Sequence, residues 1–181
     1  MRLIELTGIK QTIQGLDTQD VTHDDWETVL SKHGFSALGT GHNARVYGHS
    51  ALNYVLKIYD THDAGYRYWV AQSLQNKDNP YFPRFRGRDV RIDAQVRATR
   101  METLVPAGPD VEHFLHAVRQ LRRQYRGDWL EPAATYFAYD PQLVQALEVM
   151  DAGRQAGFMI DLKRDNIMMR GQQMVITDPL Y

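Results

Sequence analysis

The sequence predicts an α+β fold made of two unequal parts. Three observations lead to this prediction. The first half of the chain carries short apolar runs rich in β-branched and aromatic residues, which is typical of strands. The run Pro106-Ala107-Gly108-Pro109 then interrupts the pattern and is the best domain boundary in the sequence. After this break, apolar residues recur at helical spacing until two short strands close the chain.

The composition narrows the class of protein. The chain has 181 residues, of which 43% are apolar and 24% charged, the balance of a globular protein with one domain or two small lobes. A net charge of −1 does not favour a nucleic-acid partner. The absence of cysteine excludes disulfides, thiolate catalysis and cysteine-based zinc sites. No apolar run reaches the roughly 20 residues of a membrane span, and the N-terminus lacks a signal-peptide core, so we expect a cytoplasmic protein.

Residues 1–34 are expected to form an N-terminal extension. Residues 1–21 show no clear period and are interpreted as an irregular arm or short strand. A helix is predicted from Thr22 to His33, because Thr22 is a good N-cap and Gly34 can end the helix. Its apolar face comprises Trp26, Val29 and Leu30.

Residues 35–105 are expected to form a sheet of five antiparallel strands with one helix. A strand, a glycine turn and a second strand occupy residues 35–47, and a third strand runs from Tyr54 to Tyr59. Two more strands are predicted at about residues 84–92 and 95–104, with a turn near Asp93. The helix lies between these groups, from Thr61 to about Gln75, and its apolar positions are Tyr66, Trp69, Val70 and Leu74.

Residues 106–181 are expected to be mainly helical. Asp110 is the expected cap of a helix to about Arg126, with a buried stripe formed by Val111, Phe114, Leu115, Val118, Leu121 and Tyr125. Asp140-Pro141 opens a second helix, which ends at Gly153 or Gly157 and turns Leu143, Val144, Leu147 and Met150 inward.

The last stretch predicts a hairpin with polar groups at its mouth. Two apolar runs, Ile167 to Met169 and Met174 to Ile176, flank a turn at Gly171. Asp161, Asn166 and Asp178 lie beside these runs. Mg²⁺ prefers one or two carboxylate or amide oxygens together with phosphate and water, so this pattern favours a magnesium–phosphate centre.

The segment Asp161-Leu162-Lys163-x-x-Asn166 resembles the catalytic loop of eukaryotic-type protein kinases, and Asp178 falls where that family has its metal-binding Asp. The resemblance implies that Asp161 accepts or orients the proton of the substrate hydroxyl and that Lys163 steadies the γ-phosphate. It implies that Asn166 and Asp178 bind Mg²⁺. The alternative is a polar turn capped by Asp and Asn side chains.

Two further segments resemble the nucleotide-binding parts of the same family. Gly39-Thr40-Gly41-x-x-Ala44-x-Val46 is similar to the glycine-rich loop, with Ala44 where a third glycine is usual. Lys57, in Val55-Leu56-Lys57-Ile58, matches the lysine that holds the α- and β-phosphates of ATP. The alternatives are an ordinary hairpin turn and an edge-strand lysine facing water.

A further match concerns the hinge. Met101-Glu102-Thr103-Leu104 falls where the kinase hinge meets adenine, which makes Glu102 and Leu104 candidate nucleotide contacts. Together the matches span about residues 35 to 179, in the family's order.

The chain also departs from the family pattern. Met159-Ile160 replaces the usual His-Arg before the catalytic Asp, and Pro179-Leu180 replaces the Phe-Gly after the metal-binding Asp. No Glu lies within residues 61–76, so Lys57 lacks the usual ion-pair partner, and Gln72 is a neutral substitute at best. The sequence ends three residues after Asp178, which predicts a reduced helical lobe ending after the catalytic-loop hairpin.

The resemblance implies a two-lobe, kinase-like protein that uses ATP and Mg²⁺ to phosphorylate protein Ser/Thr hydroxyls. The lysine two residues after Asp161 favours this pattern over aminoglycoside-phosphotransferase-like enzymes. Compact chains of this kind resemble phage-encoded proteins, for which the host cytoplasm is the expected location. Two alternatives stay open, a pseudokinase that binds a nucleotide or a regulatory protein partner, and a small-molecule phosphotransferase. The substrate and the oligomeric state are left open.

Overall fold

The computed structural model describes residues 23–41, 43–92 and 94–181. The arm expected over residues 1–21, the cap at Thr22 and the turn at Asp93 lie outside the described residues. The chain divides into two compact units. The first comprises the described residues up to Asp63 together with residues 85–103, and the second comprises residues 64–84 and 104–181.

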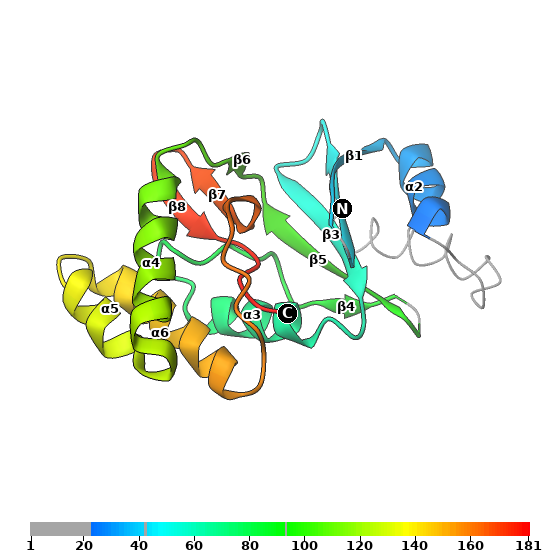
Figure 1. Ribbon diagram of the computed structural model, residues 1–181. Helices are drawn as coiled ribbons and strands as arrows, with labels where there is room; N and C mark the ends of the chain where they lie inside the picture. The colour runs from blue at the N-terminus through cyan, green and yellow to red at the C-terminus, as the bar shows by residue number, and fades with distance from the viewer. Residues whose placement is uncertain (1–22, 42, 93) are drawn as a thin grey trace. The chain divides into compact units, whose positions relative to one another are not determined.

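The first unit is built on a five-stranded antiparallel sheet preceded by one helix (Figure 1). The strand order is β1-β2-β3-β5-β4. The elements are α2 (His23–Lys32), β1 (Phe35–Thr40), β2 (Ala44–His49), β3 (Tyr54–Asp60), β4 (Val90–Arg91) and β5 (Val96–Glu102). The prediction of five antiparallel strands in an α+β protein is thus confirmed.

Helix α2 covers one face of this sheet with the three side chains that its periodicity indicates. Trp26, Val29 and Leu30 are 1%, 5% and 0% exposed, and they pack in one apolar cluster with the alternate residues Leu56 and Ile58 of β3. The helix ends before Gly34, whose φ of +79° belongs to the left-handed region that glycine adopts without strain.

The second unit combines helices with a small antiparallel sheet of order β6-β7-β8 (Figure 1). Its elements are α3 (Ala64–Gln75), β6 (Val105–Pro106), α4 (Val111–Tyr125), α5 (Leu130–Tyr136), α6 (Pro141–Gln155), β7 (Ile167–Arg170), β8 (Gln173–Ile176) and the short 3₁₀ helices η1 (Arg126–Asp128) and η2 (Arg164–Asn166). None of the helices in the described part of the chain is long and apolar enough to cross a membrane.

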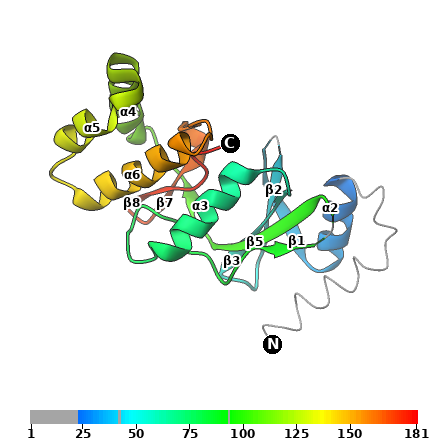
Figure 2. The ribbon, with the colours of Figure 1, turned by 90° about the horizontal axis from the view of Figure 1, so that it is seen from below.

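Helices α3 and α6 lie side by side in this unit (Figure 2). The Tyr68 hydroxyl of α3 donates to the Val149 carbonyl of α6 at 3.4 Å. The indole Nε1 of Trp69 donates to the Ile176 carbonyl at 3.0 Å, which ties α3 to β8. The structure therefore groups α3 with the second unit, whereas the predicted domain 35–105 included this helix. The boundaries 1–34, 35–105 and 106–181 remain predictions.

Most predicted elements are confirmed. The errors concern the ends of several elements and helix α5, which was not predicted. The strand expected at 84–92 is only Val90–Arg91, and helix α3 begins at Ala64 instead of Thr61. Leu74 and Tyr125, expected on buried stripes, are 36% and 41% exposed. Asp110 precedes α4 but makes no side-chain cap bond. Helix α6 continues through Gly153 to Gln155.

The hairpin at the end of the chain forms as predicted. Ile167 pairs with Ile176 and Arg170 with Gln173, and Gly171 in the turn has φ +62°. Ile167, Val175 and Ile176 are each 0% exposed, so the base of this hairpin lies in the core of the second unit.

Candidate functional site

Two backbone segments that meet in the second unit carry the predicted catalytic-loop residues. Residues 159–161 run antiparallel beside residues 179–181. Met159 and Tyr181 exchange two backbone hydrogen bonds of 2.9 and 3.1 Å. The Asp161 N–H donates to the Pro179 carbonyl at 2.8 Å, so the segment that carries Asp161 is held against the chain end.

Asn166 is bonded to the C-terminal segment at Thr177, two residues before Pro179. Its carbonyl accepts the Thr177 N–H at 2.9 Å and the Thr177 hydroxyl at 3.1 Å. Asp178 therefore lies between Thr177, which bonds to Asn166, and Pro179, which bonds to Asp161. The structure thus brings together three of the polar residues predicted from the sequence, although they span 18 positions (161 to 178).

The side chains of Asn166 and Lys163 both contact Asp161. The Asn166 amide Nδ2 donates to the Asp161 carbonyl at 2.6 Å and to its carboxylate Oδ2 at 3.1 Å. The Lys163 ammonium lies 2.7 Å from the same Oδ2. Because Nδ2 faces Asp161, the Asn166 Oδ1 is directed away from it and is suited to a cation. The Asp161 Oδ1 is likewise suited to accept a proton or a hydrogen bond from a substrate.

Carboxylates keep Lys163 in its charged form. The hydrogen bond that Lys163 donates to Asp161 is the main cause that raises the pKa of the ammonium above its ordinary value, and partial burial opposes this shift. The negative charges of Asp161, Asp165 and Asp178 raise the pKa further. Asp178 therefore lies close enough to act on Lys163, and a positive charge is maintained beside Asp161 at neutral pH.

The donor set fits Mg²⁺ only when phosphate completes it. Asn166 and Asp178 offer amide and carboxylate oxygens, the hard ligands that Mg²⁺ prefers. Within the described residues, no group of three or more His, Cys, Asp or Glu side chains is placed to hold a metal ion by itself. This is typical of Mg²⁺ centres that use one or two protein ligands together with substrate phosphates and water.

In the first unit, the register of the sheet aligns the predicted nucleotide-binding residues. Gly39 pairs with Val46, Val46 pairs with Lys57, and Lys57 pairs with Thr99. Directly paired residues turn their side chains to the same face of a sheet, so Val46, Lys57 and Thr99 form one row. Ala44 lies two residues before Val46 and shares this face. Leu56 and Ile58, which pack against α2, belong to the opposite face.

The glycine turn in this unit leaves space for close approach to the backbone. A Cβ placed on Gly39 would meet no atom within 4 Å. The Gly41 N–H donates to the Ala44 carbonyl at 2.7 Å, which closes the turn after Thr40. Lys57 is only 7% exposed, and a buried ammonium requires anionic or polar partners.

The predicted site residues fall into two groups. Gly39, Thr40, Gly41, Ala44, Val46, Lys57 and Glu102 belong to the first unit. Leu104, Asp161, Lys163, Asn166 and Asp178 belong to the second, where the last four form one cluster. Glu102 ends β5 opposite Tyr54, and Leu104 is 9% exposed. The nucleotide contacts assigned to these residues remain predictions.

Sequence reasoning missed the residues that support the cluster. Thr177 holds the Asn166 carbonyl with both its N–H and its hydroxyl. The Arg164 guanidinium donates to the Ala107 carbonyl from Nε and from one terminal nitrogen, each at 3.2 Å. For Thr177, the only signal in the sequence is its position directly before Asp178. For Arg164 there is no local signal, because its partner Ala107 lies 57 positions away.

Comparison with known proteins does not identify a family for this chain. No protein-family model matches the chain, and no curated protein matches it. Among solved structures, the chain is similar to the crystal structure of Rad53 1-466 in complex with AMP-PNP, with 18% sequence identity and a TM-score of 0.42. The match covers 87% of this chain and 43% of that chain, so this chain spans less than half the length of that protein.

Proposed function

We propose that this chain is a kinase-like protein that binds ATP with Mg²⁺ and transfers the γ-phosphoryl group to a Ser or Thr hydroxyl of a protein substrate. The observation that carries this proposal is the cluster of Asp161, Lys163, Asn166 and Asp178. Lys163 and Asn166 both contact Asp161, and the charge of Asp178 acts on Lys163. The spacing of Asp161, Lys163 and Asn166 resembles that of a kinase catalytic loop.

Each member of the cluster has a chemical role in the proposal. Asn166 and Asp178 hold Mg²⁺, which neutralises phosphate charge when it is bound. Asp161 receives the proton of the attacking hydroxyl, while Lys163 steadies the γ-phosphate. The hydroxyl oxygen forms a bond to the γ-phosphorus, the bond from that phosphorus to the bridging oxygen breaks, and ADP leaves. The proton on Asp161 is afterwards released to solvent.

Residues of the first unit are assigned to the nucleotide by the same resemblance. Lys57 holds the α- and β-phosphates, and the turn at Gly39, Thr40 and Gly41 offers backbone N–H groups to phosphate oxygens. The shared row of Val46 and Lys57 and the open space at Gly39 support this assignment. Ala44, Val46, Glu102 and Leu104 are proposed to contact the base and sugar.

A second candidate function is a pseudokinase that binds nucleotide or a regulatory protein without transfer. The observation that favours it is the composition of α3, AGYRYWVAQSLQ, which contains no acidic residue. Active kinases pair the phosphate-binding lysine with a glutamate of the corresponding helix. Here Gln72 is the nearest chemical substitute on that helix, and it carries no charge.

Nucleotide binding is tested by thermal unfolding with ATP and Mg²⁺, and with ATP and EDTA. At 100 times Kd, binding adds about 2.7 kcal/mol to the free energy of unfolding. Asp178→Asn is expected to remove the part of the shift that depends on Mg²⁺. The matched control is Asp165→Asn, which removes a carboxylate of η2 that also acts on Lys163 but has no proposed role as a ligand. No shift for the wild-type protein at millimolar ATP and Mg²⁺ would overturn the proposal.

Transfer is tested separately with ATP labelled at the γ-phosphate. The wild-type protein is expected to label itself or a protein in a lysate, and Asp161→Asn is expected to abolish this labelling. Binding without labelling would favour the pseudokinase. Labelling that persists at the wild-type rate in Asp161→Asn would disprove the role of Asp161.

A further inference from the structure

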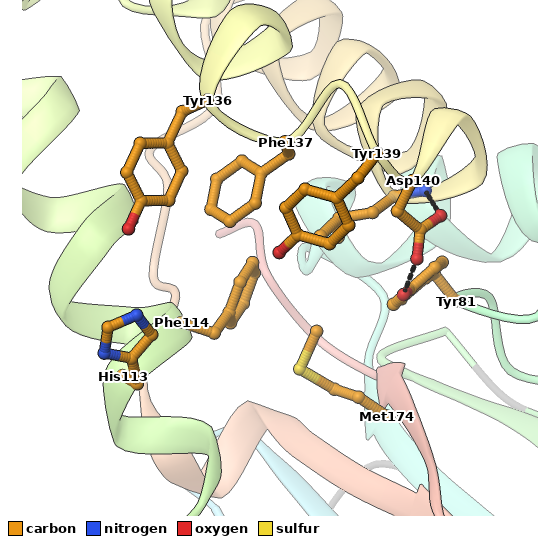
Figure 3. A pocket seen from close by; sticks show the side chains of 9 residues that line it. Tyr81, His113, Phe114, Tyr136, Phe137, Tyr139, Asp140 and Met174 are labelled. Atoms are coloured by element: carbon orange, nitrogen blue, oxygen red, sulfur yellow. Dashed lines mark hydrogen bonds between the residues drawn. The ribbon is translucent and has the colours of Figure 1, made fainter.

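The second unit contains a cavity of about 420 Å³ that none of the proposed phosphate-site residues lines (Figure 3). Pockets for small organic ligands begin at about 300 Å³, so the volume is sufficient for one. Its walls come from α4, from the end of α5, the start of α6 and the segment between them, and from Tyr81 and Met174. Residues far apart in the sequence thus meet in one aromatic-lined space.

Three aromatic residues within four positions form one wall of the cavity. Phe137 is 3% exposed and holds its neighbours: its ring centre lies 4.8 Å from Tyr136 and 6.4 Å from Tyr139, both in edge-on geometry. Phe114 of α4 approaches the same ring at 5.8 Å. Figure 3 shows the side chains of Tyr136, Phe137 and Tyr139 directed into the cavity. Tyr136 and Tyr139 are nevertheless 50% and 79% exposed, so this wall keeps large apolar surface in contact with water.

A carboxylate is fixed beside this aromatic wall. Asp140 Oδ1 accepts the Leu143 N–H at 3.0 Å as the N-cap of α6, and Oδ2 accepts the Tyr81 hydroxyl. Burial and this bond to Asp140 raise the pKa of Tyr81 to about 12, so Tyr81 remains an uncharged donor at neutral pH. Among the described residues that line the cavity, Asp140 is the only Asp or Glu, and there is no Lys or Arg.

We propose that this cavity binds an alkylammonium group, as found in choline or in a trimethylated lysine side chain. The faces of aromatic rings carry partial negative charge and attract cations, also at sites that are partly open to water. Asp140 adds a full negative charge in the same place. An anion would be repelled by both features, and a neutral ligand of the same shape would gain only the burial of apolar surface.

This inference goes beyond the proposed phosphotransfer and does not depend on it. The assay contains neither ATP nor Mg²⁺, so its outcome is separate from that of the nucleotide-binding experiment. His113 also lines the cavity and adds positive charge when it is protonated. All titrations are performed at one pH, about 8.

The test is isothermal titration calorimetry of the full chain with choline and with its uncharged isostere 3,3-dimethylbutanol. Cation–π attraction predicts that choline binds about 3- to 30-fold more tightly than the isostere. A second arm uses a short peptide with trimethyl-lysine and the same peptide with tert-butylnorleucine. Preference for the charged member in the choline pair indicates a free ligand. Preference in the peptide pair alone indicates a modified side chain, and both results support the proposal.

Variants separate the two sources of the attraction. Tyr139→Leu removes an exposed ring and is expected to weaken binding of the preferred cation about 3- to 30-fold, while Tyr139→Phe retains it. Asp140→Asn removes the charge but keeps a good N-cap for α6, and it is expected to weaken binding as well. Tyr125→Leu is the control, because Tyr125 is also an exposed tyrosine but lies outside the cavity.

Two results would overturn the inference. One is equal binding, or no binding, of the charged and uncharged members of both pairs. The other is wild-type affinity for the cation in folded Tyr139→Leu and Asp140→Asn, as checked by circular dichroism.

Discussion

The β1–β2 hairpin, which carries part of the proposed nucleotide site, and the β7–β8 hairpin, which lies next to Asn166 and Asp178, are built in different ways. In the β7–β8 hairpin of the second unit, Ile167, Val175 and Ile176 are fully buried. In the β1–β2 hairpin of the first unit, every residue of β1 after Phe35 is exposed. The β7–β8 hairpin thus has buried side chains on both strands. In the β1–β2 hairpin, Tyr47 of β2 and Phe35 at the start of β1 are buried, and the rest of β1 is exposed.

This difference matches what each hairpin is proposed to offer a ligand. The groups next to β7–β8 are side chains, and a carboxylate or amide acts on a ligand only where its position is fixed. The groups offered by β1–β2 are backbone N–H groups, which require space around glycine more than they require burial. We therefore expect side-chain deletions to matter most near β7–β8, and added atoms to be tolerated at β1–β2.

The largest effect is expected from shortening a core residue of the β7–β8 hairpin. Ile176 is 0% exposed, its N–H donates to the Tyr81 carbonyl at 2.9 Å, and its carbonyl accepts the Trp69 indole. Ile176→Ala leaves a cavity and should lower the free energy of unfolding by about 2–5 kcal/mol. Urea denaturation measures the change. The matched variant Val46→Ala in the other hairpin, where Val46 is half-buried, should cost less than about 1.5 kcal/mol, and equal costs would contradict the comparison.

The next effect contrasts two glycines. A Cβ on Gly65 of α3 would lie 2.7 Å from backbone atoms of Leu180 and Tyr181. These residues belong to the C-terminal segment 179–181, whose backbone also forms hydrogen bonds with Asp161 and Met159. Gly65→Ala should therefore destabilise the protein by about 1–3 kcal/mol, although alanine is the better helix former. Gly39→Ala adds its methyl group to open space and should change stability by less than about 0.5 kcal/mol. Thermal unfolding of both variants tests the contrast, and a stable Gly65→Ala would show that the chain end shifts without cost.

Local patterns predicted the elements well where one face of an element packs on one core. The face of α2 and the β7–β8 hairpin follow directly from apolar spacing and from the glycines that end them. The stripes of α3 and α4 were extended one position too far, to Leu74 and Tyr125, because periodicity does not show where the packing partner ends. Helix α5 was missed because its seven residues are too few for a period and include Pro132.

The two candidate sites differ in the same way: the residues around Asp161 are close in the sequence, whereas those of the aromatic cavity are far apart. The Asp161 to Asn166 spacing is local, so sequence alone placed these residues near one another, and the structure confirms their contact. The contact of Lys163 with Asp161 also follows from short spacing. The aromatic cavity was not predicted, because Tyr81, Phe114 and Tyr139 are brought together only by the packing of α4, α5 and α6.

A smaller effect is expected from Thr177, which is 8% exposed beside β8. Thr177→Val keeps the shape and the N–H but removes the hydroxyl that donates to the Asn166 carbonyl. The loss should be about 0.5–1.5 kcal/mol in the free energy of unfolding, measured in urea. Thr135→Val is the control, because its hydroxyl bonds to the Glu131 carbonyl on an exposed helix turn and should matter less. If both variants lost the same free energy, the hydroxyl of Thr177 would have no special role in holding the cluster.

The smallest effect is expected from the charge of Lys163. None of the residues proposed for the β1–β2 site within that hairpin carries a comparable charge. The side chain of Lys163 is 51% exposed, so Lys163→Met should change stability at about pH 8 by no more than about 1 kcal/mol. The pKa of Lys163 is raised in the folded protein, mainly by its bond to Asp161. Its contribution is therefore fully present below the ordinary lysine pKa of about 10.4 and is lost as pH rises through the folded value.

The pH dependence of the difference between wild type and Lys163→Met separates charge from packing. Tyr59 and Tyr81 also have raised pKa values and lower stability in alkali, but both tyrosines are present in the two proteins, so their effect cancels. Urea midpoints of wild type and Lys163→Met should thus converge above about pH 10.4, while Lys77→Met, at an exposed lysine, should show no such trend. A difference that stays constant across this range would mean that the aliphatic part of Lys163 stabilises the cluster by packing, and that its ion pair with Asp161 adds nothing to folding.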